Sequence, residues 1–142
     1  MFFCACAEAR RAARLVTQLY SRVMGPDIEP PQFALLSALD ALGGCGPAEL
    51  GRKLGVDKTT LSRNLALMEK KGWVGSAATA DARERCRIVT PAGVAILTAT
   101  KPRWAEAQSR LRAQMSAPEW QSAMEAFGTV GRAAQAAESG LE

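Results

Sequence analysis

Residues 47–70 read PAELGRKLGVDKTTLSRNLALMEK, and this stretch predicts two short helices with very little chain between them. The first segment, 47–54, begins with a proline and is followed by Gly55, which are preferred residues for starting and ending a helix. Asp57 comes two residues after the glycine and is a good N-cap for the next segment. Two helices joined by so tight a turn are typical of a helix-turn-helix.

The second of these helices has an unusual polar face. At about 100° per residue, Leu61, Leu65 and Met68 share one side and predict the buried face. Hydroxyl residues are poor helix formers, so an ordinary surface helix would favour Glu, Lys, Gln or Ala opposite this stripe. Short hydroxyls beside an arginine instead allow close approach to DNA, where they bond to phosphates and base edges. The residues expected to contact DNA from this helix are Lys58, Thr59, Thr60, Ser62 and Arg63. The alternative is a helix start that merely favours small polar caps.

The positive charge of the chain is concentrated around this helix. The 142 residues carry a net charge of +4, with 18 cations and 14 acids. Nine of those cations but only four of the acids lie between residues 50 and 90, so this segment has a charge of +5 and the remainder −1. Such a focus indicates a surface that binds a polyanion, although charge alone fits a solvated basic face equally well.

Two short stretches after the helix, 73–79 and 85–90, have strand-like side chains and enclose the polar sequence ADARER. They predict a β-hairpin, or wing, next to the recognition helix. Arginine side chains favour the narrow minor groove, where the negative potential is enhanced. We therefore expect Arg83 and Arg85 to contact DNA, with Asp81 orienting the guanidinium of Arg83.

Helices are also predicted on both sides of this region. One covers 8–24 and stops at Gly25-Pro26, and another begins at Pro30 and stops at Gly43-Gly44. A long helix is expected from Pro91, with a cap at Thr90 and a kink or pause at Pro102. A last helix is expected after Ser116, which forms a capping-box spacing with Glu119. The apolar stripes of the outer helices fit either a monomer core or a second copy of the chain.

Together these segments resemble the MarR family of bacterial winged helix-turn-helix transcription regulators. The resemblance rests on "QFALLSAL", "LGRKLGVDKTTLSRN…MEKKGWV", the "DARER" wing and "VTPAG". It implies a mainly α fold with a small β-hairpin, as one domain over 1–142. The implied winged core covers 28–90, and the implied dimerisation helices cover 1–25 and 91–140.

The resemblance also implies a function. A family member is expected to bind a palindromic DNA operator as a homodimer, to act as a repressor, and to be released by a small molecule, here expected to be an aromatic or phenolic effector. A ligand cleft is expected between the dimerisation helices and the winged core. Arg14 and Tyr20 could border it, but their spacing fits packing equally well, so no ligand residue is assigned.

The four cysteines suggest a different trigger. Cys4 and Cys6 lie near the start of the first helix, where some relatives sense peroxide, and Arg10 and Arg11 or the helix N-terminus would favour a thiolate there. A thiol-based redox regulator of the same fold is therefore the alternative hypothesis. With no histidine and no pair of CxxC motifs, neither a metal site nor a cofactor is expected.

Other classes of protein fit the sequence poorly. It has no phosphate-binding glycine loop, no nucleophile elbow and no paired acids, so we do not expect an enzyme. No apolar run reaches the roughly 20 residues of a membrane span and the start lacks a signal-peptide pattern, so a cytoplasmic protein is expected. The rival from another class is a winged-helix module that binds proteins, in which cations on both helix and wing would have no purpose.

Overall fold

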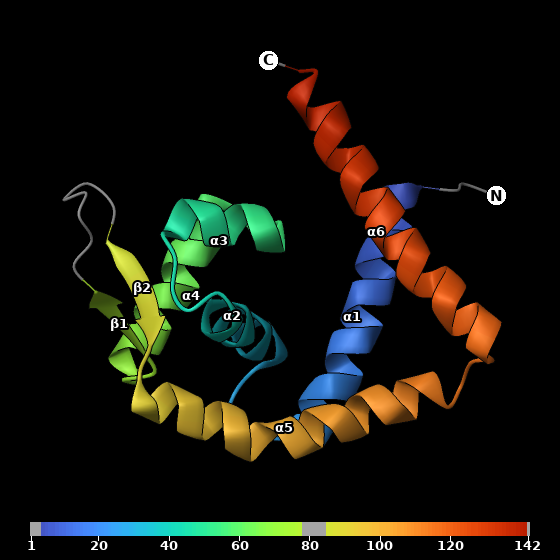
Figure 1. Cartoon of the computed structure of the whole chain (residues 1–142). Helices are drawn as coiled ribbons and strands as arrows, with labels where there is room; N and C mark the ends of the chain where they lie inside the picture. The colour runs from blue at the N-terminus through green and yellow to red at the C-terminus, as the bar shows by residue number, and fades with distance from the viewer. Residues whose placement is uncertain (1–3, 78–84, 142) are drawn as a thin grey trace. The chain divides into compact units, whose positions relative to one another are not determined.

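The computed structural model describes residues 4–77 and 85–141 and is mainly helical, with one small hairpin (Figure 1). In chain order the elements are α1 (Ala5–Met24), α2 (Pro30–Ala41), α3 (Pro47–Leu54), α4 (Lys58–Lys70), β1 (Val74–Ala77), β2 (Cys86–Val89), α5 (Pro91–Arg112) and α6 (Ala117–Ser139). The expected helix-turn-helix and wing are both present. None of the helices in the described ranges is long and apolar enough to cross a membrane.

The chain forms two compact units, one ending at Ala107 and the other beginning at Gln108. The first contains α1 to α4, the hairpin and most of α5. The second contains the end of α5 and all of α6. The segment expected to form the winged core, 28–90, therefore lies within the first unit.

The core of the first unit is formed where α2, α3 and α4 pack together with the hairpin. Leu36, Leu39 and Leu50 are fully buried there, and Met68 joins them from α4. The other buried apolar members of this cluster are Met24, Ile28, Phe33, Leu35, Cys45, Leu61, Leu65 and Val74. The inner face predicted for α4 is thus confirmed, and it holds the helix on the core by its apolar side.

The helix ends agree with the local signals in the sequence. The backbone of Gly25 has φ 83° after α1, and Gly55 adopts the left-handed conformation after α3 with φ 63°. Side chains disfavour this conformation, so glycine is the suitable residue. The carboxylate of Asp57 accepts a hydrogen bond from the backbone N–H of Thr60 at 3.0 Å, which confirms the cap of α4.

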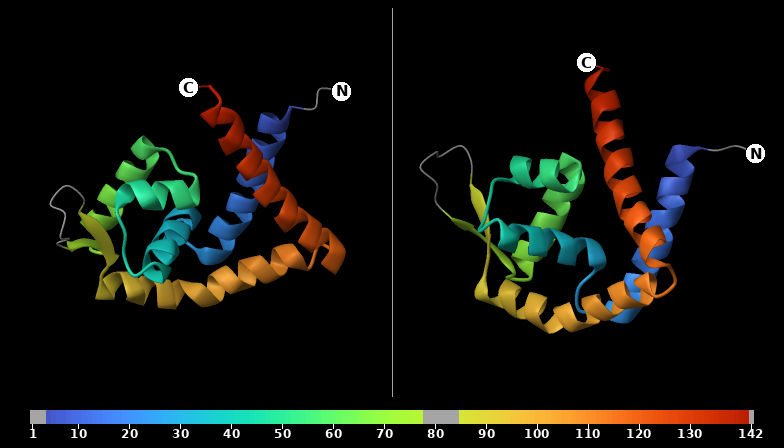
Figure 2. Two further views of the ribbon diagram at one scale, coloured as in Figure 1. Left: turned by 45° about the horizontal axis from the view of Figure 1, so that its top comes forward. Right: turned by 45° about the vertical axis from the view of Figure 1, so that its right-hand side comes forward.

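The hairpin is antiparallel and pairs Val74 with Val89 at one end and Ala77 with Cys86 at the other. Its first strand contacts α4, and the hairpin lies beside that helix in both views of Figure 2. A third piece of extended chain was not predicted. Cys45, between α2 and α3, forms an isolated bridge with Arg87, with backbone hydrogen bonds of 3.1 and 2.9 Å.

The outer helices have the predicted caps, and of the two outcomes expected at Pro102, a kink or a pause, the pause is absent. Thr90 accepts a hydrogen bond from the backbone N–H of Gly93 at 3.1 Å, and Ser116 and Glu119 form the predicted capping box of α6. A pause at Pro102 does not occur, because α5 continues through it to Arg112. Proline removes one backbone hydrogen bond of the helix and crowds the carbonyl of Thr98, and the ribbon bends in this region (Figure 1).

Candidate nucleic-acid interface

The N-terminal half of α4 presents its polar side chains to solvent. Leu61 and Leu65 are 4% and 3% exposed and anchor the helix in the core. All five of the residues predicted to contact DNA from this helix are exposed, namely Lys58, Thr59, Thr60, Ser62 and Arg63. The helix therefore offers two cations and three hydroxyls on one accessible surface, as the DNA-contact hypothesis requires.

The start of α4 is also well defined electrostatically. The hydrogen bonds from the side chain and backbone of Thr60 are the main reason why the pKa of Asp57 lies below its ordinary value. A carboxylate at this position complements the partial positive charge of the helix N-terminus. This cap fixes where the first turn of α4 begins and hence where Thr59 and Thr60 are held.

The wing contributes one described candidate, Arg85, which is exposed immediately before β2. Asp81 and Arg83 lie outside the described residues. At the other end of the hairpin, the ammonium of Lys71 lies 4.6 Å from the centroid of the Trp73 ring, a cation–π distance. The described candidates for DNA contact thus come from α4 and from the residue immediately before β2.

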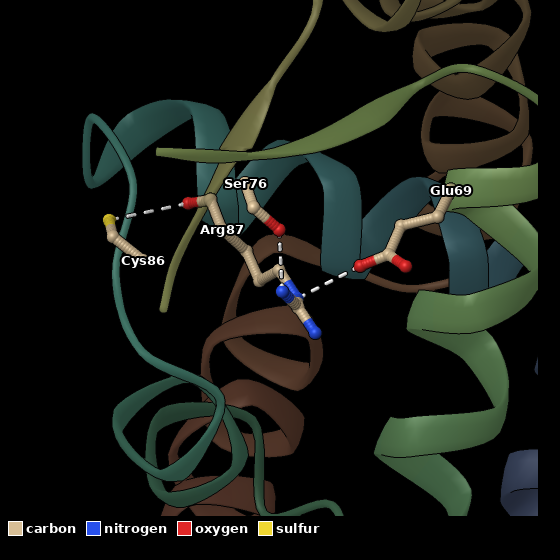
Figure 3. Close-up of polar contacts among 4 residues, drawn as sticks. All are labelled: Glu69, Ser76, Cys86 and Arg87. Atoms are coloured by element: carbon tan, nitrogen blue, oxygen red, sulfur yellow. Dashed lines mark hydrogen bonds and ion pairs between the residues drawn. The ribbon is translucent and has the colours of Figure 1, made fainter. Parts of the chain in front are cut away.

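Arg87 belongs to the same basic segment but is placed differently. Its Nε lies 2.9 Å from Oε1 of Glu69, and its Nη1 donates to Oγ of Ser76 at 2.7 Å (Figure 3). The Nε contact is an ion pair and not a directed hydrogen bond. Charge counting could not separate Arg87 from Arg85, because only the tertiary contacts distinguish a paired cation from an exposed one.

A cavity of about 670 Å³ lies within the first unit between α1, α2 and α5. Phe33 and Trp104 form part of its wall and stack with ring centroids 5.9 Å apart. Tyr20 borders it, and burial raises the pKa of its phenol. Asp40 and Lys101 supply charged groups, and both are exposed. Arg14, the other residue considered for a cleft, does not line it.

The cavity could not be assigned from the sequence because its lining comes from three helices that are far apart in the chain. Each contributing stripe has an ordinary helical spacing, and such a stripe is equally typical of core packing. The space exists only because the three helices do not pack together completely. Apolar walls with a few polar groups are typical of sites for small organic molecules.

The cysteines divide into two kinds. Cys4 and Cys6 are exposed at the start of α1, where Cys4 is the N-cap residue and makes no side-chain capping bond. Cys45 is buried, and that burial is the main reason why the pKa of its thiol is raised. Cys86 is half-buried, and its Sγ lies 3.6 Å from the carbonyl oxygen of Arg87 (Figure 3). Within the described residues, no group of three or more Cys, Asp or Glu side chains is placed to hold a metal ion.

Comparison with known proteins agrees with this architecture. A family model described as MarR family matches residues 27–84. The structure of the Mycobacterium tuberculosis transcriptional regulator MosR in complex with DNA is 34% identical, with a TM-score of 0.86 over 95% of this chain and 98% of that one. No curated protein matches significantly.

Two more distant structures share the fold. A cysteine-to-serine mutant of MarR from Escherichia coli, complexed with operator DNA, is 24% identical, with a TM-score of 0.79 over 87% of this chain and 91% of that one. PcaV from Streptomyces coelicolor in complex with its natural ligand is 23% identical, with a TM-score of 0.82 over 89% and 90%. With the winged helix-turn-helix described above and the identity to MosR along nearly the whole chain, the protein belongs to the MarR family of transcription regulators.

Proposed function

We propose that this chain binds a palindromic operator through α4 and the wing and represses transcription from the adjacent promoter. The observation that carries the proposal is the exposed row of hydroxyls and cations on the N-terminal half of α4, together with the exposure of Arg85 immediately before β2. The N-terminal residues of a recognition helix are the ones that reach base edges in the major groove. The MosR structure, which contains DNA, supports the same use of this fold.

The proposal includes a homodimer. A palindromic site requires two symmetric recognition helices, about 34 Å or a small multiple of that apart along the duplex. On α6, Met124, Phe127 and Val130 are large apolar side chains that remain 39%, 57% and 54% exposed. Their spacing of three residues gives a continuous apolar stripe, and such a stripe is stabilised by burial against a partner. A second copy of the chain is the partner that two-fold binding requires.

The proposal also includes release by a small aromatic or phenolic effector in the cavity between α1, α2 and α5. The stacked rings of Phe33 and Trp104 suit a planar apolar molecule, and Lys101 suits an anionic or phenolic oxygen. PcaV has been solved with its natural ligand, which supports effector binding by this fold. Because a transcription regulator must reach the DNA that it controls, the proposal also places this chain in the cytoplasm.

The test is selection of bound duplexes from a random pool, followed by binding measurements on the selected operator. Arg63→Ala should weaken binding by about 1–3 kcal/mol and relax the preference at one base pair if Arg63 reads a base. Arg83→Ala should weaken binding with less change in sequence preference. Arg22→Ala, which removes a cation from the last turn of α1, is the matched control. Parental affinity in both the Arg63 and Arg83 variants would show that the site is wrong.

The same operator separates DNA binding from the protein-binding alternative. Contacts with phosphates release counterions, so the logarithm of the affinity should fall steeply and linearly with the logarithm of the salt concentration. An interface with another protein responds much less. Failure to select any duplex, with weak salt dependence of nonspecific binding, would favour the protein-binding module.

A second candidate trigger is oxidation, favoured by the exposure of both Cys4 and Cys6 two residues apart. One thiolate would reduce peroxide and become a sulfenic acid, and the second thiol would then form a disulfide with loss of water. Mild peroxide should release the operator from the parent protein and from Cys45→Ser, but not from Cys4→Ser/Cys6→Ser. Binding by the parent that persists in peroxide would eliminate this trigger.

A further inference from the structure

One polar network joins the end of the recognition helix to both strands of the wing (Figure 3). Glu69 lies in the last turn of α4, Ser76 lies on β1 and Arg87 lies on β2. The guanidinium of Arg87 contacts the other two side chains at 2.9 and 2.7 Å. A single side chain therefore connects three elements that carry, or lead to, the proposed DNA contacts.

The backbone of Arg87 is held as firmly as its side chain. It pairs with Ser76 in the hairpin, and it exchanges two backbone hydrogen bonds with Cys45 in the connection between α2 and α3. These backbone hydrogen bonds fix the main chain of Arg87, so its guanidinium holds the carboxylate of Glu69 at a defined place. The pair thus restrains the position of β2 relative to the last turn of α4.

This network gives a structural reason for an acidic residue, Glu69, within the basic segment 50–90. On charge alone, Glu69 opposes the binding of phosphates by the surrounding cations. Arg87 differs from Arg63 and Arg85, which are exposed, because its side chain is only 22% exposed and is paired. Neither residue of the pair therefore has the properties expected of a direct phosphate contact.

We propose that Glu69 and Arg87 are a positioning pair that holds the wing against the recognition helix, so that an acidic side chain strengthens DNA binding. The proposal rests on the DNA-binding function proposed above. Both α4 and the wing must meet one duplex at the same time, and a restraint between them reduces the freedom lost on binding. Ser76 supports the pair by holding the other side of the guanidinium.

The decisive variant is Glu69→Gln, because the two explanations predict opposite signs. If only charge mattered, removing the acid would strengthen binding to the selected operator. If the pair positions the wing, Glu69→Gln should weaken binding by about two- to fivefold, the range expected for losing one partly exposed ion pair. Glu49→Gln, which removes an exposed acid from the first turn of α3, measures the effect of charge alone.

Further variants separate positioning from phosphate contact. In Arg85→Gln the slope of log operator affinity against log salt concentration should become shallower by about one counterion. In Glu69→Gln and Arg87→Gln this slope should not change. The double variant Glu69→Gln/Arg87→Gln should bind about as well as Arg87→Gln, because the pair is lost in either case. Ser76→Ala, at an exposed strand position, provides a milder change if the others fold poorly.

The outcomes separate failure of the positioning pair from failure of the proposed DNA-binding function. Operator binding by the parent with loss in Arg63→Ala, but equal or tighter binding by Glu69→Gln than by Glu49→Gln, would overturn the positioning pair alone. A shallower salt dependence for Arg87→Gln would do the same by making Arg87 a phosphate contact. Absence of salt-dependent operator binding by the parent would overturn the DNA-binding function itself.

Discussion

At Gly93 the backbone of α5 lies directly against the end of the recognition-helix region. A β-carbon at this position would be 2.2 Å from the carbonyl oxygen of Trp73 and 2.7 Å from Cγ1 of Val89. The first of these atoms is backbone and cannot rotate away. The glycine is therefore required by the close approach of two chain segments, and the VTPAG sequence places it there.

Overpacking in Gly93→Ala should cost about 3 kcal/mol, the upper end of the usual range, because the nearest atom is backbone. After the roughly 1 kcal/mol that alanine gains in helix propensity, the free energy of unfolding should fall by about 2 kcal/mol. Chemical denaturation measures the difference. Gly75→Ala is the control, since its β-carbon would lie at an ordinary 3.5 Å from Thr90. Equal stability of the two variants would contradict the close approach.

Asp57 makes the stability of the protein depend on pH. Hydrogen bonds from Thr60 lower its pKa in the folded state, so its contribution to stability is complete above the unfolded pKa of about 3.9. That contribution is lost as the pH falls through the lower, folded pKa. Asp57 therefore makes the free energy of unfolding change with pH only in acidic solution. At neutral pH its contribution to stability is complete.

Compared with Asp57→Asn, which keeps an acceptor oxygen but has no charge, the parent should unfold at a higher temperature at pH 7. The difference should shrink below about pH 4, as the carboxylate becomes protonated. Thermal unfolding followed by circular dichroism across the acidic range up to neutral pH measures it. The capping acid Glu119, whose pKa is also lowered, titrates in both proteins and cancels. A difference that persisted at the acid end of this range would rule out the charge of Asp57 as its cause.

Among the elements, α5 is the one that connects the cavity to the recognition helix. The hydroxyl of Thr90 donates to the carbonyl oxygen of Gly72, just after α4, and accepts from the N–H of Gly93. The N–H of Thr90 donates to the carbonyl oxygen of Trp73 at 3.0 Å. Further along, Leu97 and Lys101 of α5 line the cavity. An effector that displaced α5 would thus also displace the segment that follows α4, through the hydrogen bonds of Thr90 to Gly72 and Trp73.

Thr90→Val removes both side-chain hydrogen bonds with little change in shape. It should lower the free energy of unfolding by about 1 kcal/mol, as for the loss of other helix caps. It should also reduce the effect of an effector on operator affinity, because α5 loses its side-chain link to Gly72. Ser139→Ala is the control, since its hydroxyl bonds to the carbonyl oxygen of Gln135 within α6 and does not line the cavity. An unchanged effector response in Thr90→Val would argue against this connection.

At the scale of the whole molecule, the apolar side chains of α6 determine the assembly that we propose. Phe127 is 57% exposed, and burial of such a side chain contributes about 1.5–3 kcal/mol. Phe127→Glu should therefore weaken the dimer by about tenfold or more, and operator binding should fall with it. Sedimentation equilibrium measures the assembly.

Thr129→Glu is the matched control for this experiment, because at about 100° per residue it lies opposite Phe127 on α6. It adds the same charge to an exposed position of the same helix. A parent protein that sediments as a monomer, or a Phe127→Glu variant that dimerises like the parent, would exclude α6 as part of the interface.

The sequence by itself determined the elements of this protein, because their signals act over a few residues. Gly25 and Gly55 end helices through their own backbone conformation, and Asp57 and Ser116 cap helices through bonds to residues three positions away. The apolar spacing of α4 was equally local and indicated its buried face correctly. At Pro102 the local signal left a kink or a pause open, and the pause does not occur because a long helix can accommodate one missing hydrogen bond.

Only the tertiary structure decided which residues of those elements meet. The bridge between Cys45 and Arg87 and the ion pair between Glu69 and Arg87 join residues far apart in sequence, so no periodicity encodes them. The cavity likewise depends on how closely three helices pack. Composition could place a cationic segment near α4, but packing separated Arg87, which is held within the fold, from Arg63 and Arg85, which remain available to a ligand.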